Sequence, residues 1–320
     1  MKKIFITLFF TLAGLIAVRA QEQAVFSQYP VFPILVNPAL TGFDGGHQFL
    51  ANARSSWTGF PGAPKNYTAL YNGLFADKLG LGGGISSEKI GEMNQFRLQL
   101  NYAFHFRIQK ARISLGLNTD FLNRRINPDL LNDPTVQIND EVLERLTEGE
   151  SLFDATFGAH ALFDEKFFIS LAIPNIVRAN LDQVPVSSGG GNDDRGSDKL
   201  FSHYNLQLGY IADIASQNFK IIPSLAVRKY RDTPIQIDLN VQGRFLDEKL
   251  LAGLTYRPSV GGSMAFMIGT KINDRFMLMY AYDLSFGPFQ TYNGGGHELT
   301  AAYRLGRKYG EKAPATSPVN

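Results

Sequence analysis

Hydrophobic and polar residues alternate along most of this chain. Between Asn94 and Gln109 apolar side chains occupy every second position, and polar or charged side chains occupy the positions between them except at Ala103. A period of two places the two sets on opposite faces of an extended strand, whereas a helix would mix them around its surface. The stretch therefore predicts a β-strand with one apolar and one polar face.

The same alternation recurs over most of the chain after residue 46. It predicts about fourteen strands of roughly ten residues, the length typical of an outer-membrane barrel. The predicted strands are His47–Trp57, Asn66–Phe75, Lys78–Glu88, Asn94–Gln109, Arg112–Phe121, Leu152–Phe163, Phe167–Ile173, Tyr204–Ile214, Phe219–Tyr230, Ile235–Phe245, Leu250–Arg257, Ser263–Ile272, Phe276–Phe286 and Glu298–Leu305. About twelve or about sixteen strands also fit the pattern, because boundaries drawn from sequence shift by a few residues.

The connections between these strands alternate in length. Every second one is short and polar, such as Asp77-Lys78 and Asp164–Lys166, and the intervening ones are longer, such as Lys89–Met93, Arg124–Glu150 and Asn175–Lys199. Short turns at one end and long loops at the other are typical of transmembrane barrels, with the short turns in the periplasm. The sequence therefore predicts an all-β fold, a transmembrane antiparallel outer-membrane β-barrel. A secreted β-sandwich or propeller is the alternative, since any half-buried sheet alternates.

The start of the chain is typical of a secretory signal peptide. A basic Met1-Lys2-Lys3 precedes the apolar run Ile4–Val18, and cleavage is expected near Ala20. A single membrane anchor is the alternative, but the run is short for a span. The expected location is the outer membrane. Removal of residues 1–20 leaves a nearly neutral chain without a basic cluster, so no nucleic-acid partner is expected.

The sequence offers little catalytic chemistry. The absence of cysteine excludes disulfides, thiolate metal sites and a thiol nucleophile. The five histidines are scattered without metal-ligand spacing, and no Gly-x-Ser-x-Gly element occurs. We therefore predict no catalytic residue, cofactor or metal site. An outer-membrane hydrolase using His105 as its acid–base group is the least favoured functional alternative.

The polar faces of the strands are expected to line the lumen of the barrel. The expected lumen residues are Arg97, Gln99, Asn101, Arg107, Asn118, Asp120, Asn205, Gln207, Asp238, Asn240, Gln242, Arg244, Asp283 and Arg304. Both signs of charge are present among many amides. This composition suits a cross-linked or plugged interior as well as an open pore, so a general diffusion porin is a further alternative.

The stretch Ala24–Phe43, between the signal and the first strand, is rich in aromatic residues and proline. Pro30, Pro33 and Pro38 oppose regular structure, whereas the apolar content is too high for a free tail. We expect the stretch to dock, either inside the barrel or on a periplasmic partner. The expected organisation is a signal peptide (1–20), an irregular N-terminal docking or plug segment (21–45), the barrel (46–308) and a periplasmic tail (309–320).

Three motifs follow one another in the first third of the chain: Phe26-Ser-Gln-Tyr29, Val36-Asn-Pro-Ala-Leu-Thr-Gly42 and Trp57-Thr-Gly-Phe-Pro-Gly-Ala-Pro-Lys65. In this order they resemble elements of the PorP/SprF family, outer-membrane proteins of the type IX secretion system. Ser55-Ser56 departs from the family, which more often has Asn-Gln there.

The resemblance implies a non-enzymatic role in gliding or secreting Bacteroidetes-type bacteria: the export or surface anchoring of an adhesin or other surface protein. The partners it implies are outer-membrane lipid, periplasmic lipoprotein ring and motor parts of the type IX system, and the C-terminal domain of a secreted surface protein. The residues expected to bind a partner are Phe26, Gln28, Tyr29, Asn37, Pro38, Trp57, Phe60, Pro61 and Pro64.

Overall fold

The computed structural model describes residues 26–132, 146–181, 203–214, 218–230, 233–258, 262–287 and 293–306. The expected signal peptide (1–20) and C-terminal tail (309–320) lie outside the described residues.

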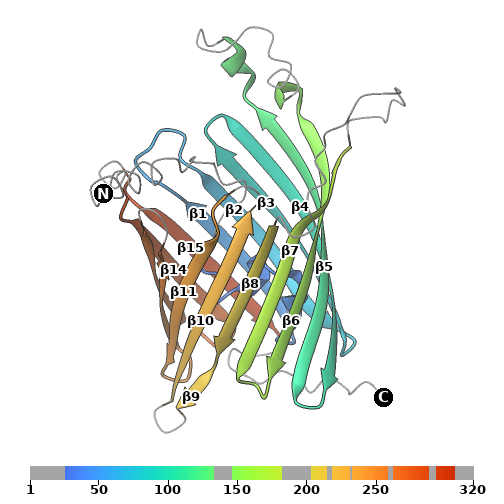
Figure 1. Ribbon diagram of the computed structural model, residues 1–320, viewed down its shortest axis with the longest axis vertical. Coiled ribbons are helices and arrows are strands. Elements are labelled where there is room, and N and C mark those ends of the chain that lie inside the picture. The colour runs from blue at the N-terminus through green and yellow to red at the C-terminus, as the bar shows by residue number, and fades with distance from the viewer. Residues whose placement is uncertain are drawn as a thin grey trace, which may run out of the picture.

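The described strands form one antiparallel sheet that closes on itself (Figure 1). They are β1 (His47–Ser55), β2 (Lys65–Phe75), β3 (Leu79–Ile90), β4 (Met93–Ile108), β5 (Ala111–Ile126), β6 (Glu150–Phe163), β7 (Phe167–Asn180), β8 (His203–Tyr210), β9 (Ala212–Ile214), β10 (Phe219–Tyr230), β11 (Gln236–Phe245), β12 (Leu250–Arg257), β13 (Ser263–Lys271), β14 (Phe276–Ser285) and β15 (Gly296–Leu305). Each strand pairs with its neighbours in sequence, and the pairing of β1 with β15 closes the ring.

Strands β8 and β9 are two parts of one strand. Both pair with β10 in the same register, and the ladder is interrupted only where Pro223 of β10 lacks an N–H to donate. The barrel therefore has fourteen strands, and the predicted outer-membrane barrel fold is confirmed. The alternative of a sandwich or propeller is wrong, because one continuous sheet closes on itself.

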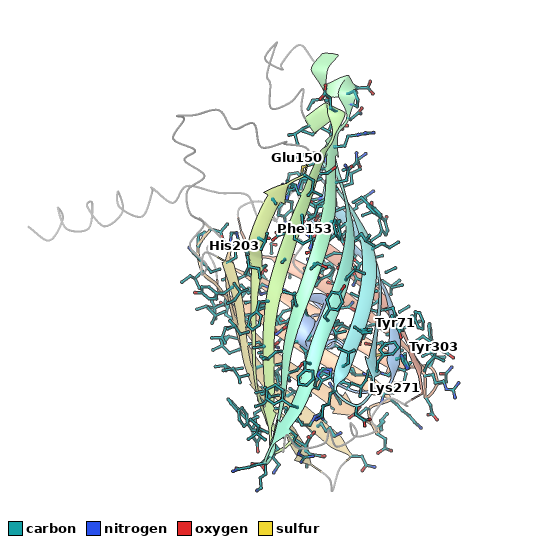
Figure 2. The ribbon with its side chains drawn as sticks, turned by 90° about the vertical axis from the view of Figure 1, so that its right-hand side faces the viewer. Tyr71, Glu150, Phe153, His203, Lys271 and Tyr303 are labelled. Carbon is teal, nitrogen blue, oxygen red and sulfur yellow. The ribbon has the colours of Figure 1, made fainter. Side chains whose placement is uncertain are left out.

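The two faces of the barrel wall differ as the alternation predicts. On β4, the side chain of Phe104 is 51% exposed while the adjacent His105 is 3% exposed. Apolar side chains such as Tyr303 point outward, and Figure 2 shows this side chain at the outer surface. An apolar outer face around a polar interior fits contact with lipid rather than with water.

None of the helices in the described part of the chain is long and apolar enough to cross a membrane.

Two strand boundaries differ from the prediction. The expected long link Lys89–Met93 is wrong, because Ile90 already pairs with Met93 and the turn is only Gly91-Glu92. Gly91 has φ +58°, which a glycine adopts without strain. Strand β7 also continues beyond the predicted end at Ile173, past Pro174. The register against β6 shifts at this point, and such a bulge accommodates a proline that has no N–H for the ladder.

The connections distinguish two ends of the barrel. Tight turns such as 109–110 and 164–166 lie at one end, called here the short-turn end. The ends of β1, β5, β7 and β14 and the starts of β2, β6, β8 and β15 lie at the other, the long-loop end, where the short 3₁₀ helix η3 (Pro128–Asn132) follows β5. Figure 1 shows η3 above the barrel at this end, and Figure 2 marks the same end by Glu150.

The stretch Phe26–Phe43, called here the lumen segment, runs inside the barrel from the long-loop end to the short-turn end. It contains two short 3₁₀ helices, η1 (Pro33–Leu35) and η2 (Pro38–Leu40). Phe32 and Ile34 pack in a buried apolar cluster with inward-facing residues of the wall, including Leu251 and Met279. In Figure 1 the blue ribbon of this segment lies within the ring of strands. Its apolar residues are therefore buried against a patch of the lumen wall.

Candidate functional site

The lumen segment is fixed at the long-loop end by Ser27 and Gln28, both fully buried. The backbone N–H of Ser27 donates to Glu298 Oε2 at 2.7 Å, and its hydroxyl donates to Asp283 Oδ1 at 2.5 Å. The Gln28 side-chain amide donates to the backbone oxygen of Glu298 at 2.8 Å. These bonds tie the segment to β14 and β15, where both strands approach the long-loop end.

Buried arginines neutralise the carboxylates that hold Ser27. Arg54 of β1 bonds Asp283 at 2.5 Å and Glu298 at 2.7 Å. Arg257 of β12 bonds Asp283 at 3.3 Å and donates to the Ser27 hydroxyl oxygen at 3.1 Å. A buried charge is costly unless it is paired and hydrogen-bonded, so the segment and the wall form one interdependent network.

Tyr29 extends this network along the wall to β10 and β11. Its hydroxyl accepts a hydrogen bond from the Asn240 amide at 2.8 Å and donates to Asp238 Oδ2 at 3.2 Å. The Arg228 guanidinium lies 4.4 Å from the centre of the Tyr29 ring and forms an ion pair with Asp238. A cation over the face of a tyrosine is attracted by the ring, and the attraction increases when both are buried.

The middle of the lumen segment is fixed by Asn37. Its amide nitrogen donates to Ser170 Oγ at 2.8 Å and to the backbone oxygen of Leu171 at 3.1 Å. Its side-chain oxygen accepts from the Ala39 N–H at 2.9 Å and so caps η2. Pro38 and Ala39 then lie against β5 and β6 at Gly116 and Gly158, where any side-chain carbon would clash with the segment.

At the short-turn end the wall binds backbone oxygens of the lumen segment. Arg112 donates to the Phe43 oxygen at 2.7 Å, and its guanidinium lies 4.3 Å from the centre of the Phe43 ring. His105 Nε2 lies 2.9 Å from the Thr41 oxygen and therefore donates to it. This bond gives His105, the candidate acid–base group of the hydrolase alternative, a role in holding the segment.

The loop that follows β1 is a separate feature. Trp57 and Phe60 are 53% and 39% exposed, and Pro61 is exposed beside them while Pro64 is half-buried. Thr58 holds the loop at the long-loop end, because its N–H donates to the Gly295 oxygen at 2.8 Å. We call residues 57–64 the Trp57 loop.

The structure thus divides the expected partner-binding residues into two groups. Gln28, Tyr29, Asn37 and Pro38 are buried in the lumen, and Phe26 lies half-buried at the long-loop end of the segment. The second group lies on the exposed Trp57 loop. Partner binding by either group stays a prediction.

Several residues that hold the segment were absent from the expected lumen set. They are Arg54, Arg112, Ser114, Arg228, Arg257 and Glu298. Their inward positions in the alternation could have indicated their face, but no pattern in the sequence indicates the partner that each one bonds. In the described residues, no three His, Asp or Glu side chains group as a metal site.

Cavities lie beside the lumen segment, and two of them bear on its surroundings. One of about 110 Å³ lies toward the long-loop end, between Phe26, Asn37 and the strands β2 to β5. The other, of about 460 Å³, lies toward the short-turn end and is lined by charged side chains of both signs, including Asp44, Arg112 and Glu248.

A closed fourteen-strand barrel with an apolar outer face and its own N-terminal segment inside the lumen is an outer-membrane β-barrel protein. Residues 18–303 match the family model described as "Type IX secretion system membrane protein PorP/SprF". The chain belongs to this family.

Several solved structures are similar to this chain at low sequence identity. A structure described as the CymD monoaromatic hydrocarbon channel has a TM-score of 0.51 and 9% identity, covering 90% of this chain and 94% of its own. The Ralstonia pickettii toluene transporter TbuX has a TM-score of 0.49 at 8% identity, covering 86% of this chain and 93% of its own. The Acinetobacter baumannii outer membrane protein Omp33 has a TM-score of 0.47 at 8% identity, covering 82% of this chain and 100% of its own. No curated protein matches the chain.

Proposed function

We propose that this protein is a non-enzymatic outer-membrane barrel of the type IX secretion system that helps export a surface protein or adhesin, or anchors it at the cell surface. The single observation that carries the proposal is the match of residues 18–303 to the PorP/SprF family. The proposed partners are the C-terminal domain of the exported protein and periplasmic lipoprotein components of the system. The role in gliding or attachment is part of the same proposal.

The lumen segment inside the barrel favours a scaffold role for this protein over the role of a diffusion channel. A diffusion porin needs a continuous aqueous path, whereas the lumen segment bonds to opposite sides of the wall through Ser27, which bonds β14 and β15, and Asn37, which bonds β6 and β7. In the proposed orientation the short turns face the periplasm and the long-loop end faces outward. The exposed aromatic side chains of the Trp57 loop then lie on the outer rim, where an exported domain arrives.

Deletion of the gene tests the proposal. We expect at least one surface protein of the type IX system to disappear from the cell surface and accumulate inside the envelope or in the medium. Surface display should return when the wild-type gene is restored. Normal display of every type IX cargo in the deletion strain would refute the proposal. Recording from purified protein in planar bilayers tests the porin alternative, which requires a large and steady conductance.

A further inference from the structure

A polar cavity beside the lumen segment has the properties of a built binding site. It is the cavity of about 110 Å³ toward the long-loop end, called here the Asp120 cavity. Its wall is formed by inward-facing residues of neighbouring strands, with Asn101 directly opposite Asn118 in the β4–β5 ladder and Gln99 opposite Asp120. Asn205 of β8 closes the other side.

Four side chains of this wall carry polar atoms without a hydrogen-bond partner among the described residues. They are Asn101 Nδ2, Asn118 Oδ1, Asp120 Oδ1 and Asn205 Oδ1. The four residues are only 2%, 9%, 4% and 7% exposed. Each buried polar group left unsatisfied costs about 1–3 kcal/mol. Such a concentration of these groups around one cavity points to a polar occupant.

The chemistry of the wall favours a cation that is rich in hydrogen-bond donors. Glu88 and Asp120 both line the cavity and are at least nine-tenths buried; Arg97 lines it beside them, and Arg124 lies near Glu88 outside the lining. Arg97 lies 3.5 Å from Asp120 Oδ2 and so leaves the other carboxylate oxygen without a bond. Three of the four unsatisfied atoms are acceptors, and rotation of the Asn101 amide would present its oxygen as a fourth.

The size of the cavity limits which ligands it can enclose. A volume of about 110 Å³ is smaller than the roughly 300–1,000 Å³ of pockets that enclose whole drug-sized ligands. It is sufficient for one guanidinium or ammonium group. Planar guanidinium donors match carboxylate and amide oxygens arranged on one wall.

We propose that the Asp120 cavity binds the guanidinium or ammonium group of a cationic ligand. This cationic group belongs either to a polypeptide, as an arginine or lysine side chain, or to a free small amine. This site goes beyond the proposed role in secretion and does not depend on it, since it follows from the wall of the cavity alone.

Calorimetric titration of the full-length protein in detergent tests the proposal. The probes are N-acetyl-arginine amide and N-acetyl-citrulline amide, which have nearly the same shape but differ in charge. We expect the arginine compound to bind at least about ten-fold more tightly. Asp120→Asn and Glu88→Gln should each weaken its binding by about ten-fold or more. The control Asp213→Asn removes an exposed carboxylate at the other cavity and should leave the affinity unchanged.

A second variant covers the case in which the charge variants do not fold. Ser86 lines the cavity, and Ser86→Phe keeps both carboxylates while filling the space. It should abolish binding in a barrel that still shows heat-modifiable mobility on electrophoresis. Equal affinity for the two probes, no detectable binding of either, or unchanged binding to a folded Ser86→Phe barrel would overturn the proposal. Displacement of the arginine probe by millimolar Ca²⁺ would also overturn it, because the site would then be a metal site.

Two further probes distinguish the sources of the cation. One is a blocked pentapeptide with arginine between alanines, and the other is agmatine, a free amine with the same guanidinium. Tighter binding of the peptide supports a polypeptide side chain as the ligand. Tighter or equal binding of agmatine supports a free small cation.

Discussion

The hydroxyl of Ser27 donates a hydrogen bond of 2.5 Å to the carboxylate of Asp283, across 256 positions of sequence. Asp283 also bonds Arg54 and Arg257, which belong to two other strands. The contact therefore joins the lumen segment to three parts of the wall at once. We infer that the segment is part of the folded barrel rather than a leader that precedes it.

This network predicts that Arg54 is essential for stability. Arg54→Met would leave the carboxylates of Asp283 and Glu298 buried with one fewer cation, and breaking a buried ion pair from one side costs about 3–5 kcal/mol. We expect the variant to unfold at a clearly lower denaturant concentration in detergent. Arg107→Met is the matched control, because among the described residues the Arg107 side chain bonds only the exposed backbone oxygen of Gln109. Equal stability of the two variants would contradict the prediction.

A second prediction concerns closure of the lumen. Tyr29→Ala combined with Asn37→Ala removes the bonds of the lumen segment to β11 and β7, while every strand residue is retained. We expect this variant to insert as a barrel and to show larger and longer openings in planar bilayers than the wild type. Trp57→Ala, on the exposed loop, should behave as the wild type. If the double variant is as silent as the wild type, the segment is not what closes the lumen.

A pH prediction rests on Glu248, in the turn between β11 and β12. Burial acts to raise its pKa, but Arg244, Lys220 and Lys271 outweigh this effect and lower the pKa from 4.5 to about 2. The Lys220 ammonium lies 2.7 Å from the carboxylate. A carboxyl group whose pKa is lower in the folded protein stabilises the fold fully above its unfolded pKa. That stabilisation is lost as the pH falls through the folded value.

We therefore expect Glu248 to stabilise the fold above about pH 4.5 and to lose this effect between about pH 4.5 and 2, by no more than about 3 kcal/mol. Glu248→Gln should flatten the dependence of the unfolding free energy on pH in this window. Asp247→Asn, exposed in the same turn, serves as the control and should keep the wild-type slope. Identical slopes for all three proteins would show that Glu248 does not contribute.

The sequence predicted the strands of the barrel wall better than the contacts inside the lumen. Alternation identifies which face of a strand a residue occupies, and it correctly placed Asp238 and Asp283 inside. It does not give the height of a residue along the lumen or the strand that lies opposite. Contacts such as Tyr29 with Asp238 join residues 209 positions apart and depend on closure of the whole ring. The arginines that complete the network could therefore not be paired from sequence.

The last prediction concerns the Trp57 loop as a docking surface. Trp57 has φ +52°, and its side chain is 53% exposed. The side chain of Phe60, three residues later, is 39% exposed. Large exposed aromatic side chains are enriched where proteins bind one another. If an exported domain docks on this rim, Trp57→Ala with Phe60→Ala should reduce its co-purification with the barrel by about ten-fold or more. Tyr67→Ala removes an aromatic side chain that is 58% exposed on the outer face of β2, and should leave the yield unchanged. Equal recovery of the exported domain with both variants would exclude the Trp57 loop as the docking surface and leave the lumen segment as the remaining predicted binding site.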